Sequence, residues 1–394
     1  MFDVVVVGSG FAGSVLAERL SNVLRKRVLI IEKRPHIGGN SYDYYNEEGL
    51  LVHKYGPHVF RTNSKEVFEY LSKFTEWIPY QHKVLANING TKVPVPFNLN
   101  SLYKLFPAET ARSLELKLVK HFGYGTRIPI LKLKKVADEL GDKDLKSLAN
   151  FVYEKVYLNY TLKQWEESPE ELIGVLDRVP VVLSRDNRYF NDKYQAMPKY
   201  GYTTLFYKML LNPNIKILLN TDYKEVLEVD IDTGEVSLFG KPWKGILIYT
   251  GPIDYFFDYE FGELPYRSLE FKFETYNVEY FLDAAVENYP NEYDFTRITE
   301  FKRLTFQKHP KTTVAYEYPR KYIPSKNEPY YPIPRKENLR RYQLYNERAR
   351  LLNNKSKTRF IFIGRLAEYK YYTMSDVIQR ALDEFKKLMG ANKI

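Results

Sequence analysis

The chain has 394 residues and a formal charge of +10, from 59 Lys and Arg against 49 Asp and Glu. Its 35 Tyr and 24 Phe exclude a disordered chain, and the absence of Cys excludes disulfides, thiol catalysis and cysteine-ligated metals. The basic residues are dispersed, and no uncharged apolar run reaches the roughly 18 residues of a membrane helix. We therefore expect a cytoplasmic protein without a membrane span that binds no nucleic acid, and whose charge attracts a small polyanionic substrate.

The first forty residues are predicted to form a strand, a glycine-rich turn, a helix and a second strand. Residues 2–7 are a β-branched run typical of a strand buried on both faces, so they are not a signal peptide. Apolar residues at helical spacing follow over residues 14–24, and residues 27–31 form a second apolar run. This order is typical of a dinucleotide-binding fold.

The turn between the first strand and the helix has the glycine spacing of a dinucleotide site. Gly8 permits the tight turn, Gly10 lets the backbone approach a pyrophosphate, and Gly13 lets helix and strand pack closely. The helix N-terminus, at Phe11 and Ala12, offers unpaired N–H groups to the phosphates. The alternative is a turn that packs the helix and binds no ligand.

The residues after the second strand favour one cofactor. Glu32 ends that strand and can accept hydrogen bonds from both hydroxyls of a ribose. NAD and FAD share this pattern, but the stretch from Lys33 to Gly39 and Asn40 contains a Gly-Gly pair. This pair resembles the FAD signature of flavoproteins of the glutathione-reductase and amine-oxidase type. Paired glycines let the chain pass an extended cofactor without side-chain clash, so we expect FAD.

Two kinds of segment follow. Residues 101–175 have helical periodicity over residues 114–122 and 145–156, which predicts a mostly helical insertion. Residues 79–100 and 175–340 are rich in Pro and Tyr and alternate in polarity, which predicts antiparallel sheet. Later strands are expected at residues 215–220, 225–229, 245–249 and 359–363, then a turn at Gly364 and a helix over residues 375–389.

The predicted fold is therefore α/β, with a discontinuous Rossmann-like FAD-binding domain that begins at one terminus and is completed at the other. A helical insertion and an antiparallel β-sheet domain interrupt it. The expected domains are residues 1–78, 205–262 and 340–394 for FAD binding, 101–174 for the helices, and 79–100, 175–204 and 263–339 for the sheet and the substrate.

Seven later segments together resemble the UDP-galactopyranose mutases of bacterial type. The strings YTLKQW and TRITE are distinctive, and the segments span nearly the whole chain in the family's order. They are residues 54–62, 159–165, 178–180, 189–198, 295–300, 329–332 and 364–371. The resemblance implies an isomerase that interconverts UDP-galactopyranose and UDP-galactofuranose for surface polysaccharides.

In the mechanism that this resemblance implies, N5 of reduced FAD attacks the anomeric carbon and UDP leaves. The sugar ring then recloses through another hydroxyl, and UDP returns. The flavin acts as a nucleophile and no net electrons move. The resemblance also implies a homodimer and an external reductant, such as NAD(P)H or a flavin reductase.

The resemblance assigns substrate roles to arginines and aromatic residues. Arg178 and Arg297 match two arginines that hold the diphosphate, a role that suits a bidentate guanidinium. Tyr160 matches the residue on which uracil stacks, and Trp165 lines the sugar region. Tyr157 is a weaker uridine-site candidate. The tyrosines that match diphosphate- and sugar-contacting positions are Tyr189, Tyr331 and Tyr371.

The flavin end of the site is assigned in the same way. His58 lies in a loop expected to approach the isoalloxazine ring, with a structural histidine as the alternative, and His82 is expected near the active site. None of the six His has metal-ligand spacing, so we expect no metal. Backbone N–H groups before the last helix are expected at the flavin pyrimidine ring, where the helix stabilises the reduced anion. The residues of this turn are Gly364, Arg365, Thr373 and Met374.

Three positions depart from the family pattern. The second His of a HxFH string is Arg61 here, and we expect its guanidinium to widen acceptance to the 2-acetamido sugar UDP-N-acetylgalactosamine. Val182 replaces the last Arg of RxPxR, so it is no phosphate ligand. Thr373 stands where the family has Asp, which removes a carboxylate contact to the sugar. These departures concern the sugar more than the reaction type.

Two other functions stay open at this point. A redox flavoenzyme of the amine-oxidase type would share the cofactor fold and take hydride onto FAD. Such an enzyme has no need of two phosphate-binding arginines beside a base-stacking tyrosine. A basic nucleic-acid-binding protein would bind DNA or RNA in a salt-dependent way and would carry no flavin.

Overall fold

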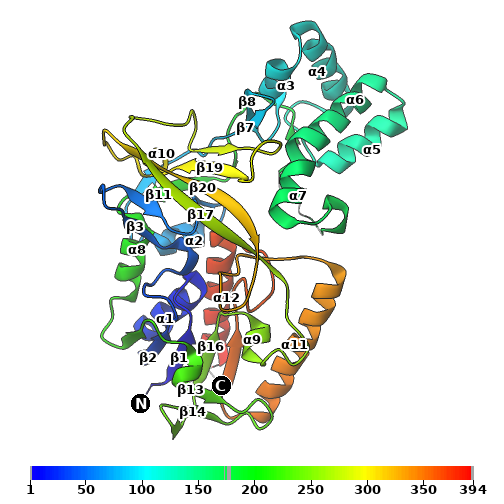
Figure 1. Ribbon diagram of the computed structural model, residues 1–394. Helices are drawn as coiled ribbons and strands as arrows, with labels where there is room; N and C mark the ends of the chain where they lie inside the picture. Colours follow the sequence, from blue (N-terminus) through cyan, green and yellow to red (C-terminus); the bar gives the residue numbers. More distant parts are fainter. Residues whose placement is uncertain (1, 173, 175–178, 392–394) are drawn as a thin grey trace.

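Strands from both ends of the chain form one parallel sheet (Figure 1). The computed structural model describes residues 2–172, 174 and 179–391. The strand order is β12-β2-β1-β16-β22, and every neighbouring pair is parallel, which confirms the Rossmann-like prediction. The five strands are β1 (Val4–Val7), β2 (Val28–Ile31), β12 (Ile215–Leu218), β16 (Ile246–Tyr249) and β22 (Arg359–Phe362).

Both faces of this sheet are buried, as its unbroken apolar strands predict. Val4 and Val6 of β1 belong to an apolar cluster with helices α1, α8 and α12. Val5 and Val7 point the other way, into a cluster with helices α9 and α11. The helices are α1 (Phe11–Asn22), α8 (Gly201–Leu210), α9 (Ile253–Phe256), α11 (Lys336–Lys355) and α12 (Met374–Ala391).

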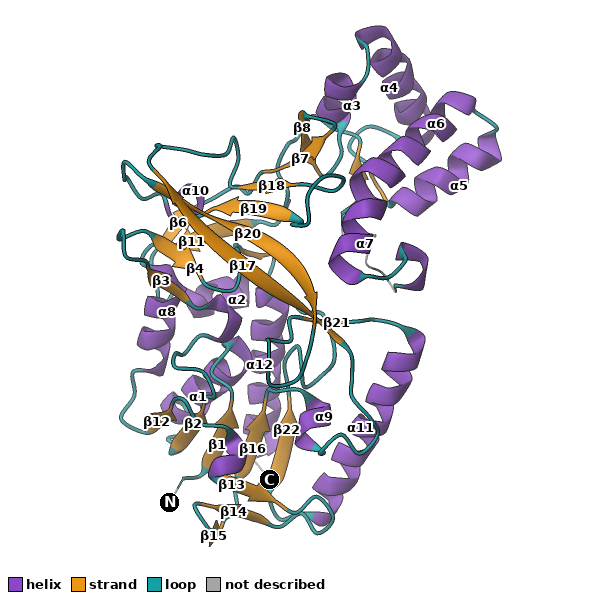
Figure 2. Cartoon of the chain, in the orientation of Figure 1, coloured by secondary structure: helices purple, strands orange, loops and turns teal. Residues whose placement is uncertain are grey.

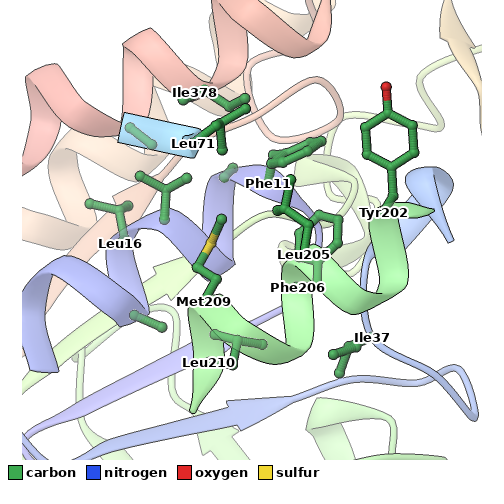
Figure 3. Packing of buried hydrophobic residues seen from close by; sticks show 14 of the residues in the cluster. Phe11, Leu16, Ile37, Leu71, Tyr202, Leu205, Phe206, Met209, Leu210 and Ile378 are labelled. Carbon is green, nitrogen blue, oxygen red and sulfur yellow. The ribbon is translucent and has the colours of Figure 1, made fainter. Parts of the chain in front are cut away.

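Helix α8 packs against the start of α1 (Figure 3). The ring of Phe11 lies 4.6 Å from Phe206 and 6.4 Å from Tyr202, both on α8. Ile378 of α12 joins the same cluster, and all four side chains are buried. Burial of an aromatic or Ile side chain stabilises the fold by about 1.5–3 kcal/mol, so this cluster fixes the N-terminus of α1 in place.

The helical insertion lies at the end of the molecule far from the parallel sheet (Figure 1). The two predicted helical stretches are confirmed by α4, by α6 and by a π-helical turn at Tyr153–Leu158 that continues α6. Asn98 and Asp142 cap the N-termini of α3 and α6 with their side chains. The α-helices are α3 (Leu99–Leu105), α4 (Ala108–Phe122), α5 (Ile130–Leu140), α6 (Lys143–Val152) and α7 (Asn159–Trp165).

A second, seven-stranded sheet lies between the parallel sheet and the helical insertion (Figure 2). Its order is β21-β17-β20-β19-β18-β7-β8. The other neighbouring strands pair antiparallel, as predicted, whereas β18 pairs with β7 in parallel. Alternating polarity does not encode the relative direction of strands 200 residues apart. The strands are β7 (Val84–Ile88), β8 (Thr91–Val95), β17 (Tyr266–Tyr276), β18 (Val286–Asn288), β19 (Arg297–Glu300), β20 (Thr312–Lys321) and β21 (Tyr331–Pro332).

Short elements complete the described fold, and the limits of the three domains stay a prediction. In the described part of the chain, no helix is both long and apolar enough to cross a membrane. The remaining elements are α2 (Lys65–Leu71), α10 (Lys302–Thr305), β3 (Asp43–Tyr45), β4 (Leu51–His53), β5 (Phe60–Thr62), β6 (Trp77–Pro79), β9 (Arg127–Ile128), β10 (Val181–Val182), β11 (Tyr194–Pro198), β13 (Leu227–Val229), β14 (Val236–Leu238) and β15 (Lys241–Pro242).

Candidate active site

A cavity of about 500 Å³ opens at the carboxyl ends of the parallel strands. The chain leaves β1 and β16, which are neighbours in the sheet, toward helices on opposite faces. Ligands of open α/β sheets bind at such a switch point. The predicted cofactor residues that line the cavity are Gly8, Gly10, Phe11, Ala12, Glu32, Lys33, Gly39, Asn40, Gly364, Arg365, Thr373 and Met374.

Bare backbone forms the wall where a pyrophosphate is expected. A Cβ atom on Gly39, whose φ is +56°, would lie 2.9 Å from the Cα atom of Gly10. No side chain caps α1, so the N–H groups of its first turn have no side-chain partner, and Phe11 and Ala12 of that turn line the cavity. Gly13 does not line the cavity; a Cβ atom there would lie 2.1 Å from the carbonyl oxygen of Gly8, as expected of a packing glycine.

Glu32 is a buried residue that lines the cavity, and hydrogen bonds fix its carboxylate. Its Oε2 accepts hydrogen bonds from the backbone N–H and the hydroxyl of Ser9, at 2.9 and 2.7 Å. Its Oε1 accepts from the backbone N–H of Arg34 at 3.0 Å. A carboxylate oxygen has two lone pairs, so Oε1 can still accept from a ribose hydroxyl.

An ion pair crosses the cavity between the Rossmann-like part and the segment that follows β20. Arg34 donates to Glu328 at 2.6 Å and to Asn40 at 3.0 Å, and its guanidinium lies 4.4 Å from the ring centre of Tyr55. Arg34, Asn40 and Glu328 all line the cavity. Burial raises the pKa of the Glu328 carboxyl, but the Arg34 charge outweighs it, and the net shift is downward. Glu328 was not predicted from the sequence.

His58 also lines the cavity, as do Arg365 and Met374. Its Nδ1 lies 2.9 Å from the carbonyl oxygen of Gly56, so Nδ1 carries the proton and Nε2 is a hydrogen-bond acceptor. The backbone N–H of His58 donates to Nδ1 of His53 at 3.0 Å. Burial lowers the pKa of both imidazoles to about 3, so both rings are neutral near pH 7.

The last helix begins at the same place. Thr373 forms a capping box for α12: its backbone N–H and hydroxyl donate to Asp376 at 3.0 and 2.7 Å, and its Oγ1 accepts from the Asp376 N–H. Thr373 therefore caps the helix, at the position where the resemblance predicts a carboxylate. Thr373, Met374 and Val377 line the cavity at this helix end.

Arg297 is the centre of a second cluster of predicted residues. Its Nε and Nη2 both bind Oε2 of Glu317, at 2.8 and 2.7 Å. Burial disfavours the Arg297 charge, but the adjacent Glu317 carboxylate outweighs it, and the pKa of Arg297 is raised. The positive charge of Arg297 also acts on the ionisable groups around it. Burial raises the pKa of the tyrosines, and the Arg297 charge opposes this rise. Burial lowers the pKa of the histidines, and the Arg297 charge lowers it further. The residues affected are Tyr160, Tyr189, Tyr331, His58 and His82.

An aromatic wall joins the two clusters. The rings of Trp165 and Tyr331 lie 5.8 Å apart, and those of Tyr331 and Tyr371 lie 5.9 Å apart. The guanidinium of Arg365, which lines the cofactor cavity, lies 5.5 Å from the ring of Tyr331 and 5.2 Å from that of Tyr371. Arg365 therefore stands where the cofactor cavity meets the aromatic wall.

His82 and Tyr189 are in contact and within the electrostatic reach of Arg297, and Tyr157 is near Tyr189. Nδ1 of His82 lies 2.9 Å from the hydroxyl of Tyr80, and its ring lies 5.6 Å from that of Tyr189. Burial lowers the pKa of His82 to about 3. The hydroxyl of Tyr157 is buried and has no partner in the part of the chain that the structure describes. A buried unpaired hydroxyl is costly, so this group is a candidate for a ligand contact.

Arg61 lies on β5 and turns toward β11. Its Nη1 binds both carboxylate oxygens of Asp192, at 2.9 and 3.0 Å, and its guanidinium lies 4.2 Å from the ring centre of Phe190. The positive charge of Arg61 opposes the rise that burial causes in the pKa of Tyr189. Arg178, the other predicted diphosphate ligand, lies outside the described residues. No group of three His, Asp or Glu in the described ranges could hold a metal ion.

Glu317 is the residue of this cluster that sequence reasoning missed. It lies in β20, where residues 312–315 and 317 are buried, and its side chain is 2 % exposed. A glutamate at a buried position of a strand requires a charged or hydrogen-bonding partner. The buried strand position of Glu317 therefore indicates that it has a partner. It does not identify that partner, which is Arg297 on β19, 20 residues away.

Comparison with known proteins agrees with this geometry. A sequence profile described as UDP-galactopyranose mutase matches residues 155–371, and one described as an NAD(P)-binding Rossmann-like domain matches residues 6–74. A UDP-galactopyranose mutase of Mycoplasma genitalium is 37% identical over 402 residues, covering 99% of this chain and 95% of its own. This chain belongs to the UDP-galactopyranose mutase family.

The family membership makes the chain an isomerase. A probable UDP-galactopyranose mutase of Klebsiella pneumoniae is 32% identical, covering 97% of this chain and 94% of its own. A dTDP-fucopyranose mutase of Escherichia coli is also 32% identical, over the full length of both chains. A crystal structure of reduced UDP-galactopyranose mutase has the same fold, with a TM-score of 0.74 at 16% identity, covering 99% of this chain and 94% of its own.

Proposed function

We propose that this family member interconverts the pyranose and furanose forms of UDP-galactose with reduced FAD as cofactor. One observation carries the proposal: the dinucleotide cavity and the aromatic wall meet at Arg365, which lines the first and stacks on Tyr331 and Tyr371 of the second. A sugar held against these tyrosines is adjacent to the flavin end of the cavity. This adjacency is what a reaction between cofactor and sugar requires.

FAD fits the residues that line the cavity. The bare wall at Gly10 and Gly39 and the uncapped N-terminus of α1 suit a pyrophosphate, and Glu32 suits a ribose. When bound, a reduced flavin supplies a nucleophilic nitrogen for the anomeric carbon. The interconversion moves no net electrons, so the substrate does not reduce the flavin. The electrons come instead from an external reductant, such as NAD(P)H or a flavin reductase. A cytoplasmic homodimer stays a prediction.

We assign the leaving UDP to Arg297 and the aromatic residues near it. Glu317 holds Nε and Nη2 of Arg297, and Nη1 has no partner in the described part of the chain, so Nη1 can bind a phosphate oxygen. A partly buried cation that is held in place stabilises the charge that develops on the diphosphate as it leaves. Arg178 is proposed as a second guanidinium. Tyr160 provides the platform for the base, and Trp165 lies beside the sugar.

His58 is proposed as a neutral hydrogen-bond acceptor at the flavin end. Since its Nδ1 proton is directed at Gly56, its Nε2 can accept a proton donor from the cofactor or the sugar. The pKa of about 3 keeps the ring uncharged near pH 7. A charged imidazolium there would instead compete with Arg297 and Arg365 for the diphosphate.

We propose that Arg61 extends acceptance to UDP-N-acetylgalactosamine. Asp192 occupies Nη1 of Arg61, whereas Nε and Nη2 have no partner among the described residues and can donate to an acetamido carbonyl. Arg61→His is expected to reduce turnover of the acetamido sugar relative to the unsubstituted one. Equal turnover ratios for the two proteins would contradict this role. dTDP-fucose is the alternative substrate, because of the Escherichia coli relative.

The test is a product analysis with three furanose substrates. Dithionite-reduced protein is incubated with UDP-galactofuranose, its 2-acetamido analogue and dTDP-fucofuranose, and the pyranose forms are followed chromatographically. We expect UDP-galactopyranose to form without stoichiometric consumption of dithionite. A redox enzyme of the amine-oxidase type would consume reductant or substrate electrons in proportion to product. Conversion of dTDP-fucofuranose alone, or of no sugar, would overturn the proposal.

A further inference from the structure

Helix α7 carries two proposed substrate contacts, Tyr160 and Trp165, and also a lysine that no role has yet been given. Nζ of Lys163 donates to the carbonyl oxygens of Tyr289 and Glu292, at 2.8 and 2.7 Å. Both carbonyls belong to the loop between β18 and β19. Lys163 is therefore directed at the protein and away from the cofactor cavity, although it is part of the distinctive YTLKQW string.

Two further hydrogen bonds hold the same loop to the same helical segment. Nδ2 of Asn159 donates to Oδ1 of Asn291 at 2.9 Å, and Nδ2 of Asn291 donates to the carbonyl oxygen of Lys155 at 3.1 Å. Four hydrogen bonds thus join the loop to this segment, three to α7 and one to the π-helical turn before it. The two from Lys163 carry a full positive charge, and charge-assisted hydrogen bonds are roughly twice as strong as neutral ones.

The loop that Lys163 binds leads directly into Arg297. Residues 289–296 connect β18 to β19, and Arg297 is the first residue of β19. The rings of Tyr289 and Phe295 lie 5.1 Å apart, so the loop packs on itself. Lys163 therefore connects the helix that carries the proposed base platform with the strand that carries the proposed diphosphate ligand.

Another cation holds the far end of α7. Arg267 of β17 is 2 % exposed; its Nε donates to the carbonyl oxygen of Gln164 at 2.9 Å, and its Nη atoms pair with Glu166 at 2.7 and 3.0 Å. Arg267 lies opposite Tyr331 in the β17–β21 register. It therefore fixes the C-terminal end of α7 against the aromatic wall, whereas Lys163, together with the neutral Asn159–Asn291 contact, holds α7 to the loop before Arg297.

We propose that Lys163 is a positioning residue that holds the base platform of α7 at a fixed spacing from Arg297, so that one UDP molecule contacts both. This inference rests on the proposed function. A ligand that bridges two elements binds much more tightly when their spacing is already set, because its second contact is then intramolecular. A ligand that contacts only Arg297 gains nothing from that spacing.

The test compares UDP with inorganic pyrophosphate, which has the diphosphate but no base. Both ligands are titrated by calorimetry into the flavin-loaded protein and into Lys163→Met, Lys163→Arg and Lys143→Met. For K163M we expect UDP affinity to fall by about ten-fold, while pyrophosphate affinity stays within about two-fold. K163R, which keeps the charge and the donors, is expected to restore most of the UDP affinity. K143M removes an exposed lysine at the start of α6 and is the matched control.

The results distinguish a failure of the Lys163 inference from a failure of the proposed function. Wild-type UDP affinity in K163M, or an equal loss of UDP and pyrophosphate, overturns the positioning role, because the second result is that of general damage to the site. A KM increase with kcat within about three-fold in the mutase assay supports it, since uniform binding energy has been lost. A folded wild-type protein that binds no UDP refutes the proposed function instead.

Discussion

The cofactor cavity and the substrate region are built from different parts of the polypeptide. Backbone forms the cavity wall, at Gly10, Gly39 and the uncapped start of α1, beside the carboxyl ends of parallel strands. Side chains form the substrate region, where Arg297, Glu317 and the tyrosines of several distant segments meet. A site made of backbone is specified by local chain geometry, whereas a site made of side chains depends on segments that tertiary structure brings together.

The largest effect that this comparison predicts is on substrate turnover without loss of flavin. Arg297→Lys keeps the positive charge next to the buried Glu317 but loses the planar fork that binds two groups at once. We expect kcat/KM to fall by about 100-fold or more, as when a preorganised transition-state contact is removed. Steady-state kinetics and the flavin absorbance of the purified protein measure the two properties.

Arg320→Lys is the matched control, since Arg320 forms an exposed ion pair with Glu270 on the same sheet. It is expected to keep wild-type kinetics, because exposed pairs contribute little. If R297K retained more than about a tenth of the activity, Arg297 would not be the diphosphate ligand. Loss of flavin from R297K would instead show that the two regions are not separable.

Gly39→Ala is expected to have the opposite effect, a loss of FAD affinity with the substrate contacts intact. The new Cβ atom would lie 2.9 Å from Gly10, at a positive φ, so the cavity wall has to move. With strain of about 2 kcal/mol, FAD affinity is expected to fall roughly 30-fold. Gly49→Ala is the control, since its φ is +75° but its Cβ atom would meet nothing within 4 Å. Equal FAD affinities for the two variants, measured by flavin fluorescence, would contradict the backbone-wall interpretation.

A smaller effect is expected at the Arg34–Glu328 ion pair of the cofactor cavity. Glu328→Gln removes the charge that pairs with Arg34 and is expected to speed FAD release by roughly five-fold, with little change in the association rate. Stopped-flow mixing of the FAD-loaded protein with an excess of an apoprotein that binds FAD tightly measures this rate. Glu270→Gln, which breaks the exposed pair with Arg320, should release FAD at the wild-type rate. Identical rates for all three proteins would mean that the cross-cavity pair does not retain the cofactor.

The smallest predicted effect concerns acid stability. Burial lowers the pKa of His53 and His82 to about 3, whereas an unfolded histidine titrates near 6.5. Between these values the unfolded chain binds protons that the native chain does not, so the free energy of unfolding falls as the pH falls below about 6.5. Each histidine contributes up to about 1.4 kcal/mol per pH unit.

Urea unfolding of the full chain between pH 7 and pH 5 measures this dependence. His82→Gln is expected to make the slope of stability against pH shallower, whatever its effect on stability at pH 7. His121 is exposed on α4, and His121→Gln should leave the slope unchanged. A slope that is the same in H82Q and the wild type would mean that His82 titrates normally in the native protein.

Prediction from sequence succeeded where neighbouring residues determine the structure. β1, α1 and β2 follow from apolar runs and glycine spacing within the first 31 residues, and α4 and α6 follow from their periodicity. Helix α8 was not predicted, because its apolar side chains are interleaved with polar and tyrosine positions and its N-terminus has no side-chain cap. The structure shows its role, which is to pack Phe206 and Tyr202 against Phe11 at the start of α1.

The sequence by itself determined the dinucleotide turn, the α/β class and the family, because each depends on residue types at fixed short spacing or on strings with a fixed order. Only the tertiary structure decided that Glu317 binds Arg297, that Glu328 reaches Arg34 across the cavity, and that Lys163 holds the loop before Arg297. The physical reason is that a charged side chain is stabilised by whichever partner the fold brings within hydrogen-bond distance. That partner lies 20, 294 or 126 residues away in these three cases.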